Sequence, residues 1–188
     1  GAIGGTLAGF MSKEGEDVLL IDSWREHVDA MNKHGLTLDG ITGEHNVAVN
    51  AIHTDQIPNI EGIFDMVVVA VKSYDTQDAI KRMLPFMNDD TWVVSPQNSI
   101  NEVRIAPIVG ANRTLGCVTT ISAGIYEPAH ITRTGSVSQS LQKEPICFKV
   151  GELHGEITPR VEKIVDLFSS AGKTVPTEDL WGERWSKM

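Results

Sequence analysis

The first residues carry glycines at the spacing of a phosphate-binding loop. Gly1 and Gly4 enclose Ala2 and Ile3, an order that matches the second half of a G-x-G-x-x-G motif. In that motif one glycine lets the backbone approach a pyrophosphate, and the last lets the following helix pack closely on a sheet. The helix N-terminus favours the negative charge of the phosphates. We therefore expect Gly1, Ala2, Ile3 and Gly4 to bind the pyrophosphate of a dinucleotide.

An acid follows at about the distance that this motif requires. An apolar run predicts a short strand ending in Asp22, 18 residues after Gly4. A carboxylate there accepts hydrogen bonds from the ribose hydroxyls and repels a 2′-phosphate, so Asp22 favours NAD over NADP. Arg25 favours NADP, because a nearby arginine holds the 2′-phosphate. In a structural interpretation, Asp22 or Ser23 caps the next helix.

Polar residues also follow two other predicted strands. The run 66–71 is apolar at every position, as expected for a strand buried on both faces of a parallel sheet, and it ends at Lys72. The strand at 92–94 leads to Asn98. Open α/β sheets bind ligands at the carboxyl edge of their strands, where we expect both side chains to lie with the glycine loop. The alternatives are a solvated lysine for Lys72 and a turn residue for Asn98.

The elements around these residues predict an α/β protein. Strands alternate with helices, which is typical of a Rossmann-like, doubly wound and mostly parallel sheet. From residue 114 the pattern changes to strands, and we expect these to add antiparallel strands to the sheet. Gly151 and Glu152 are predicted to form a turn, and Trp181 and Trp185 to make core contacts. Helices are expected at 24–34, 74–87, 158–171 and 178–188, and further strands at 35–40, 46–51, 115–121, 129–135, 146–150 and 174–176.

The length of 188 residues suits one domain and the start of another. We predict a dinucleotide-binding domain at 1–176, lacking its first strand, and the first helix of a helical substrate and dimerisation domain at 177–188. A sheet without that strand would leave its neighbours unpaired. We therefore expect the natural molecule to be longer than this sequence.

Composition argues against several classes of function. The net charge is −9 and basic residues are scattered singly, which speaks against nucleic acid or an anionic membrane as partner. No apolar run approaches the roughly 20 residues of a membrane span, and no leader precedes the glycines, so a cytoplasmic protein is expected. Cys117 and Cys147 form no metal or redox motif and are expected to be buried. The histidine spacing predicts no metal site.

Five short motifs, taken in order, resemble the ketopantoate reductase (2-dehydropantoate 2-reductase) family. They are Gly-Ala-Ile-Gly, Val-Lys, Gln-Asn, Val-Gly-Glu and Trp-Ser-Lys, at residues 1–4, 71–72, 97–98, 150–152 and 185–187. The resemblance covers the whole chain, as the family's N-terminal dinucleotide domain and the first helix of its C-terminal domain. It implies reduction of a small 2-keto acid, ketopantoate, to a 2-hydroxy acid with NADP or NAD, and a homodimer formed through the C-terminal domain.

The resemblance also implies roles for single residues. Lys72 and Asn98 would contact cofactor and substrate near the nicotinamide, with Asn98 part of the catalytic group. Lys187 would be the catalytic lysine that polarises and protonates the keto oxygen. A cationic donor suits this role because the oxygen develops the charge of an alkoxide. Without the resemblance, Lys187 would be interpreted as a surface lysine on an amphipathic helix.

The sequence departs from the family pattern in three places. Ser99 stands where the family usually has glycine after Gln-Asn. Asp22 differs from the basic or neutral residue of NADPH-preferring members. The sequence also ends before the downstream asparagine, serine and glutamate with which the family contacts substrate.

Three other functions remain open at the level of sequence. One is an NAD-dependent D-2-hydroxyacid dehydrogenase of the same superfamily, which Asp22 supports. Another is a non-catalytic module that senses NAD(H). Such a module has no catalytic activity, so substitution of Lys187 would abolish no turnover. The last is a structural α/β domain with a decayed site, which would bind no cofactor.

Overall fold

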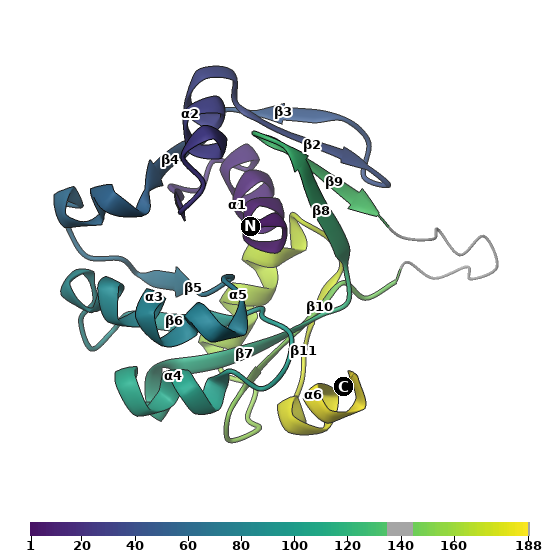
Figure 1. Ribbon diagram of the computed structural model, residues 1–188. Coiled ribbons are helices and arrows are strands. Elements are labelled where there is room, and N and C mark those ends of the chain that lie inside the picture. Colours follow the sequence, from purple (N-terminus) through teal and green to yellow (C-terminus); the bar gives the residue numbers. More distant parts are fainter. Residues whose placement is uncertain (135–144, 188) are drawn as a thin grey trace. The chain divides into compact units, whose positions relative to one another are not determined.

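The computed structural model describes residues 1–134 and 145–187, and its elements are labelled in Figure 1. Gly135 and Met188, which end two of the predicted elements, lie outside the described residues. The chain divides into two compact units. The first unit comprises Gly1–Asn59, Ile121–Pro145 and Ser170–Lys173, and the second comprises Ile60–Thr120, Ile146–Ser169 and Thr174–Met188.

The first unit contains two small sheets. Strands β1 and β4 pair in parallel, and a four-stranded sheet has the order β3-β2-β9-β8 with β2 parallel to β9. The unit's elements are α1 (Ala2–Lys13), β1 (Leu19–Asp22), α2 (Arg25–His34), β2 (Leu36–Gly40), β3 (His45–Val47), β4 (Asn50–His53), the 3-10 helix η1 (Thr54–Asn59), β8 (Ser122–Glu127) and β9 (His130–Thr134).

Helix α1 packs on the four-stranded sheet through glycines. A Cβ at Gly5 would collide with Ile131 of β9, and one at Gly9 would lie 2.8 Å from Leu38 Cδ1 of β2. The small residues let the helix axis approach the sheet, which is the packing function that the sequence assigned to the last glycine of the motif. Gly5 and Gly9 supply it here.

The second unit is built on a five-stranded sheet with the order β11-β10-β7-β6-β5. Strands β5, β6 and β7 run parallel, β10 is antiparallel to β7, and β11 is parallel to β10. The elements are β5 (Met66–Val68), η2 (Ser73–Asp75), α3 (Thr76–Met83), η3 (Leu84–Phe86), β6 (Trp92–Ser95), α4 (Glu102–Val109), η4 (Ala111–Arg113), β7 (Thr114–Thr119), β10 (Phe148–Glu152), α5 (Pro159–Ser169), β11 (Thr174–Pro176) and α6 (Leu180–Lys187).

Helices α3 and α4 lie side by side in the second unit (Figure 1). They bury apolar side chains against its strands. Ile80 of α3, Ile105 and Val109 of α4, Val93 of β6 and Val69 form one apolar cluster. This core holds β5 and β6 in place, and the segments that leave their carboxyl ends carry Lys72 and Asn98.

The predicted fold class is confirmed: the chain is an α/β protein with Rossmann-like parallel strands, helices and added antiparallel pairing. Several element predictions were incomplete. Helix α4 and strand β8 were not predicted, and the run 46–51 divides between β3 and β4. The predicted helix at 74–87 becomes α3 between the 3-10 turns η2 and η3. Pro85 accounts for the turn that ends it, because it has no amide for a continued helix.

Two predictions near the C-terminal segment were wrong. Gly151 and Glu152 form no turn, because they pair with Gly116 and Leu115 inside the sheet. Glu152 is buried there, and its carboxylate binds the Arg160 guanidinium. Trp185 makes no core contact, since its residue is 64% exposed. Trp181 is half-buried and donates a hydrogen bond to the Leu153 carbonyl at 3.0 Å.

Candidate functional site

The first unit brings the start of α1 and the end of β1 together. The Gly1 nitrogen lies 2.6 Å from Asp22 Oδ2. The Trp24 amide donates a hydrogen bond to Asp22 Oδ1 at 2.9 Å. Asp22 therefore also bonds the backbone just before α2, but the interpretation that Asp22 or Ser23 caps this helix was wrong, because Trp24 stands at the N-cap position. The glycine and the acid are thus adjacent, as the dinucleotide motif demands.

The N-terminus of α1 has the character of an anion site. The first bond of the helix runs from the Gly5 amide to the Gly1 carbonyl at 2.9 Å. The amides before Gly5 precede the first internal bond of the helix, so they are the groups that a helix offers to a ligand. The first turn contains no acidic residue, and within the described residues no side chain caps it. These residues fit the pyrophosphate of a dinucleotide.

Arg25 is held by neighbours on the surface of the first unit. Its guanidinium lies 2.8 Å from Asp55 Oδ2 and 3.1 Å from His53 Nδ1. Both members of the Arg25–Asp55 pair are more than half exposed. An exposed ion pair contributes no more than about 1 kcal/mol. Asp55 therefore competes for Arg25 with any incoming phosphate, but weakly.

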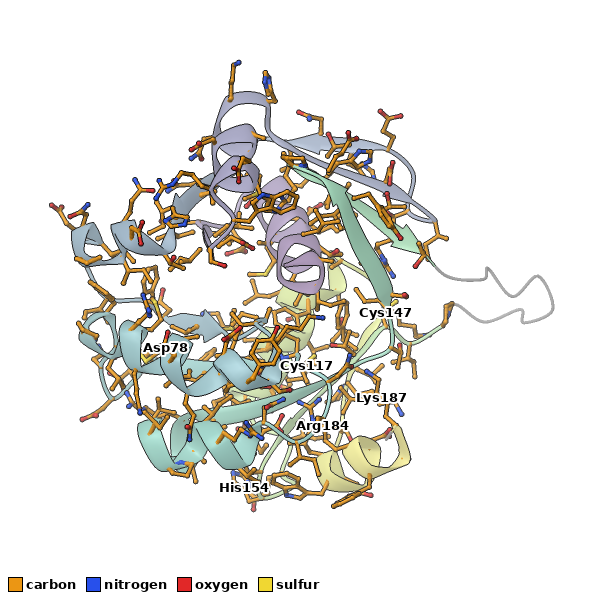
Figure 2. All side chains as sticks on the ribbon, in the orientation of Figure 1. Asp78, Cys117, Cys147, His154, Arg184 and Lys187 are labelled. Atoms are coloured by element: carbon orange, nitrogen blue, oxygen red, sulfur yellow. The ribbon has the colours of Figure 1, made fainter. Side chains whose placement is uncertain are left out.

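The second unit brings the two predicted catalytic residues into contact. Lys187, the last residue of α6, donates a hydrogen bond to Asn98 Oδ1 at 2.6 Å. Its ammonium also donates to the carbonyl of Thr119 at the end of β7. Figure 2 labels Lys187 and Arg184 on the same helix, with Cys117 of β7 also marked. The ammonium is held by two oxygen acceptors at the carboxyl edge of the sheet.

Partial burial of the ammonium and a neighbouring charge act together on Lys187, although the residue as a whole is exposed. Burial lowers the pKa of its ammonium below the ordinary value, and the positive charge of Arg184 lowers it further. A lysine with a lowered pKa gives up its proton more readily near neutral pH. The site therefore holds a cationic proton donor that can act as a general acid.

Gln97 connects the segment after β6 to the segment after β5. Its side-chain amide donates to the Val71 carbonyl at 2.6 Å and to Thr76 Oγ1 at 2.8 Å. Lys72 lies directly after Val71 and is exposed. Gln97 thus fixes the backbone next to Lys72 relative to the backbone next to Asn98.

Asn98 sits in a tight and unusual loop. The Asn101 side-chain amide donates to the Asn98 carbonyl at 2.8 Å and to Ser73 Oγ at 3.0 Å. The next residue, Ser99, has a φ of +70°. Residues with a side chain rarely adopt this backbone region, whereas glycine adopts it freely. The position therefore explains why a glycine would be expected after Gln-Asn.

The structure divides the predicted site residues between the units. Gly1, Ala2, Ile3, Gly4, Asp22 and Arg25 belong to the first unit, and Lys72, Asn98 and Lys187 belong to the second. Sequence reasoning missed the groups that hold Asn98 and Lys187 in place. These are Gln97, Asn101, Thr119, Glu102 and Arg184. Gln97 belonged to the Gln-Asn motif. A polar side chain directly after a buried strand was a signal from which its structural role could have been predicted.

Three further observations concern the cysteines, possible metal ligands and the length of the helices. Both cysteines are buried, as predicted. Within residues 1–134 and 145–187, no three His, Cys, Asp or Glu side chains are grouped so as to hold a metal ion. None of the helices in this described part combines the length and the hydrophobicity needed to cross a bilayer.

Comparison with known proteins decides the family. The family model described as ketopantoate reductase PanE/ApbA matches residues 1–144. The chain belongs to the ketopantoate reductase family. It is 34% identical over 189 aligned positions to a 2-dehydropantoate 2-reductase of Pyrococcus horikoshii, covering 100% of this chain and 57% of that protein. An Aquifex aeolicus 2-dehydropantoate 2-reductase is 24% identical, over 94% of this chain and 52% of its own length.

Solved structures share the fold. A D-mandelate dehydrogenase in complex with NADH and anilino(oxo)acetate superposes with a TM-score of 0.82 at 20% identity, covering 100% of this chain and 57% of that one. A 2-dehydropantoate 2-reductase from Geobacter metallireducens also gives 0.82, at 23% identity, over 100% and 58% of the respective chains. This ketopantoate reductase family chain thus spans little more than half the length of the proteins it matches.

Proposed function

We propose that this chain serves the reduction of a 2-keto acid to a 2-hydroxy acid by a nicotinamide dinucleotide, with 2-dehydropantoate as the substrate. The observation that carries the proposal is the hydrogen bond between Lys187 and Asn98 at 2.6 Å. It brings an ammonium that can protonate the carbonyl oxygen together with a neutral amide that orients this ammonium. Reduction of a carbonyl needs such a positioned proton donor. The relatives named 2-dehydropantoate 2-reductase support the substrate.

The reaction balances with one hydride and one proton. The reduced nicotinamide, when bound, supplies the hydride that forms a C–H bond at the carbonyl carbon. The electron pair of the carbonyl π bond moves to oxygen, and the Lys187 ammonium delivers its proton there, forming the hydroxyl group. The ammonium stabilises the oxygen as negative charge develops, and an amine remains to be reprotonated by water.

Asn98 holds the lysine in its reactive position. Its side-chain oxygen accepts one ammonium proton, and the Thr119 carbonyl accepts another. An ammonium has three N–H donors, so one donor is left for the keto oxygen. The Asn98 side-chain NH2 is a further donor, from which the substrate carboxylate or the carbonyl oxygen of the nicotinamide amide can accept a hydrogen bond. We propose that Lys72 contributes a second positive charge toward the same ligands.

The residues of the first unit fit the pyrophosphate and the adenosine ribose of a dinucleotide. We propose that Gly1, Ala2, Ile3 and Gly4 bind the pyrophosphate and that Asp22 binds the adenosine ribose. NADH is the expected partner, because the Asp22 carboxylate would repel a 2′-phosphate. Arg25 is the residue that would admit NADPH, and its pairing with Asp55 opposes this use. Substitution of Asp22 by asparagine removes the repulsion and should shift the ratio of dissociation constants toward NADPH.

The decisive experiment follows consumption of NADH and NADPH by the full-length protein given 2-dehydropantoate. Turnover with either cofactor supports the proposal, and the preferred one shows whether Asp22 or Arg25 governs the ribose site. Cofactor binding without turnover of this or any 2-keto acid would overturn it in favour of a sensor. Absence of cofactor binding would indicate a structural domain.

A D-2-hydroxyacid dehydrogenase is the second candidate, and Asp22 favours it because such an enzyme would use NAD. The same assay with an aromatic 2-keto acid such as benzoylformate separates the two. Faster turnover of the aromatic acid than of 2-dehydropantoate would favour the second candidate.

We further propose that residues 177–188 begin a helical domain that completes the substrate site and forms a homodimer in the cytoplasm.

A further inference from the structure

A buried ion pair lies beside the Lys187 site and has no role in the proposed chemistry. Arg184 is 2% exposed and Glu102 is 0% exposed, and the guanidinium contacts the carboxylate. Burying two charges carries a large desolvation penalty, and well-packed apolar residues often replace such a pair without loss of stability. Stability alone is therefore a weak explanation for this pair, and a more specific role can be tested.

The guanidinium of Arg184 joins three parts of the second unit. It contacts Glu102 of α4, and it donates to the Ser95 carbonyl at 2.8 Å and to the Gln97 carbonyl at 2.5 Å. Those two carbonyls lie just before Asn98 in the chain. The planar fork of an arginine can hold several acceptors in a fixed geometry, which a lysine cannot do. Arg184 therefore fixes the backbone that carries Asn98.

The same contacts fix the helix that carries Lys187. Arg184 and Lys187 are three residues apart on α6, so they share a face. Leu180, one turn earlier, lies against Gly116 of β7, where a Cβ would approach Leu180 Cδ2 to 2.6 Å and Glu102 Oε1 to 2.8 Å. The close approach of α6 to the sheet leaves no room for a side chain at Gly116.

We infer that Arg184 is a positioning residue: it locks α6 to the backbone of Ser95 and Gln97, so that the Lys187 ammonium is held on Asn98 beside a fixed positive charge. The inference rests on the proposed function, because it assigns Arg184 a part in the chemistry of Lys187. Arg184 does not touch the reacting atoms in this assignment.

The surroundings single out Arg184 as the charge that acts on Lys187. Burial lowers the Lys187 pKa, and Arg184 lowers it further, whereas an ionised Cys117 would raise it. Burial raises the pKa of the Cys117 thiol to about 12, so this thiol is neutral at ordinary pH. Glu102 faces Arg184 from α4 and is bound by it.

Two further ion pairs lie on or near α6. Lys149 of β10 lies 2.6 Å from Glu183 Oε2, a carboxylate of α6. Glu152 of β10 is bound by Arg160 at 2.6 Å. Lys149 and Glu183 remain paired in every variant described below, whereas the Glu152–Arg160 pair is changed only in the control.

Two variants separate position from charge. Arg184→Lys keeps the positive charge but loses the fork, so kcat should fall about 10- to 100-fold, as expected when a reacting group is misplaced by about 1 Å. The alkaline limb of the kcat–pH profile should stay where it is in the wild type. The double variant Arg184→Met with Glu102→Gln removes both charges and leaves neither buried ion unpaired. It should lose kcat and also move the alkaline limb to higher pH, because the cation next to Lys187 is gone.

A matched control exists in the same unit. Arg160 and Glu152 form a second ion pair with a buried carboxylate, in which two nitrogens of Arg160 donate to the two oxygens of Glu152. The double variant Arg160→Met with Glu152→Gln makes the same chemical change away from Lys187. Its stability is expected to change, while kcat and the alkaline limb should match those of the wild type.

A second measurement does not depend on turnover. The rate at which acetic anhydride acetylates Lys187, measured by mass spectrometry as a function of pH on the full-length protein, reports the pKa of this lysine. The pKa should rise in the Arg184→Met, Glu102→Gln variant and stay unchanged in the Arg160→Met, Glu152→Gln control. Folded variants with wild-type kcat and an unshifted Lys187 pKa would overturn the inference.

The two measurements distinguish failure of this inference from failure of the proposed function. A wild-type protein without turnover, in which Lys187 labelling nevertheless shifts as described, removes the proposed reaction but leaves the action of Arg184 on Lys187 in place. A wild-type protein that reduces 2-dehydropantoate, with neither shift nor loss of kcat in the variants, leaves the reaction in place and removes Arg184 from it.

Discussion

The Lys187 ammonium and the Asn98 side-chain oxygen are hydrogen-bonded at 2.6 Å although 89 positions separate them in the chain. One residue ends α6, and the other follows β6. Their contact depends on the sheet of the second unit, whose β7 contributes the Thr119 carbonyl to the same ammonium. A proton donor and its orienting amide are thus assembled from three separate segments.

Replacing Lys187 by methionine should abolish most of the turnover. A general acid typically contributes 10²- to 10⁴-fold, so kcat of the full-length protein should fall by about that factor. The dissociation constant of NADH should change little, because the proposed role of Lys187 lies in proton delivery. Steady-state kinetics and fluorescence titration of the cofactor measure the two quantities. Lys81→Met, on the exposed face of α3, is the matched control, and an equal loss in both variants would contradict the assignment.

The lowered pKa of Lys187 predicts the pH dependence of reduction. The ammonium is the form that donates the proton, so kcat should be high below the pKa of Lys187 and fall as pH rises through it. Burial and Arg184 lower that pKa from 10.5, so the alkaline limb should lie below pH 10.5. A profile of log kcat against pH tests this directly. A limb at or above pH 10.5 would show that this ammonium is not the titrating acid.

Substitution of Ser99 by glycine should stabilise the protein. Ser99 has a φ of +70°, a conformation that costs a residue with a side chain about 1 kcal/mol and costs glycine nothing. The free energy of unfolding from urea titration should therefore increase by roughly that amount, reduced somewhat by the greater backbone freedom of glycine in the unfolded chain. Ser169→Gly, at the end of helix α5, should have the opposite sign. Destabilisation by Ser99→Gly would mean that the serine side chain makes a compensating contact.

Two glycines with positive φ separate backbone strain from steric collision. Gly15 has a φ of +96° and open space where a methyl group would be added, whereas a Cβ at Gly40, with a φ of +92°, would collide with the Arg133 carbonyl of β9. Gly15→Ala should cost about 1 kcal/mol from strain alone. Gly40→Ala should cost roughly 1–3 kcal/mol more, because backbone atoms must move. Equal losses in thermal or urea unfolding would argue against the close approach of β2 and β9.

His27 should make the protein sensitive to mild acid. Its Nδ1 accepts the Ala129 amide at 2.9 Å, which requires an unprotonated Nδ1. Burial lowers the pKa of this buried imidazole below 6.5. Below pH 6.5 the unfolded chain therefore binds a proton that the folded chain does not. The free energy of unfolding thus decreases as the pH is lowered, until the pH falls below the lowered pKa of the folded state.

The measurement is the free energy of unfolding across about pH 5 to 8, and His27→Gln, which keeps an acceptor for the Ala129 amide, should flatten the acid slope.

His130 acts in the opposite direction. Its hydrogen bonds to Glu127 and Asp39 raise its pKa, so its contribution is present at acid pH and lost as pH rises through that raised value. His130→Gln should therefore steepen the acid slope, and an unchanged slope in both variants would exclude these imidazoles.

The sequence determined the features that depend on local order. Glycine spacing placed the start of α1, the apolar runs placed β1, β5 and β6, and the acid after β1 marked Asp22. These signals survive in the fold because helix starts and buried parallel strands are specified by neighbouring residues. Helix α4 escaped prediction because Pro107 lies inside it and masks its periodicity.

The tertiary structure alone decided which polar groups meet. Arg184 was not among the residues that the sequence singled out, yet it is buried against Glu102, 82 positions away. Strand β2 joins β9 across the chain, and Trp185 turned out to be exposed although its spacing suggested a core contact. Composition and periodicity show which face of a helix or strand is apolar and which is polar. The segment that packs against each face is set by sheet order and register, which involve residues far apart in sequence. The candidate catalytic and binding residues could therefore be predicted from the sequence. The groups that orient them could not, because they meet only where the sheet brings β6, β7 and α6 together.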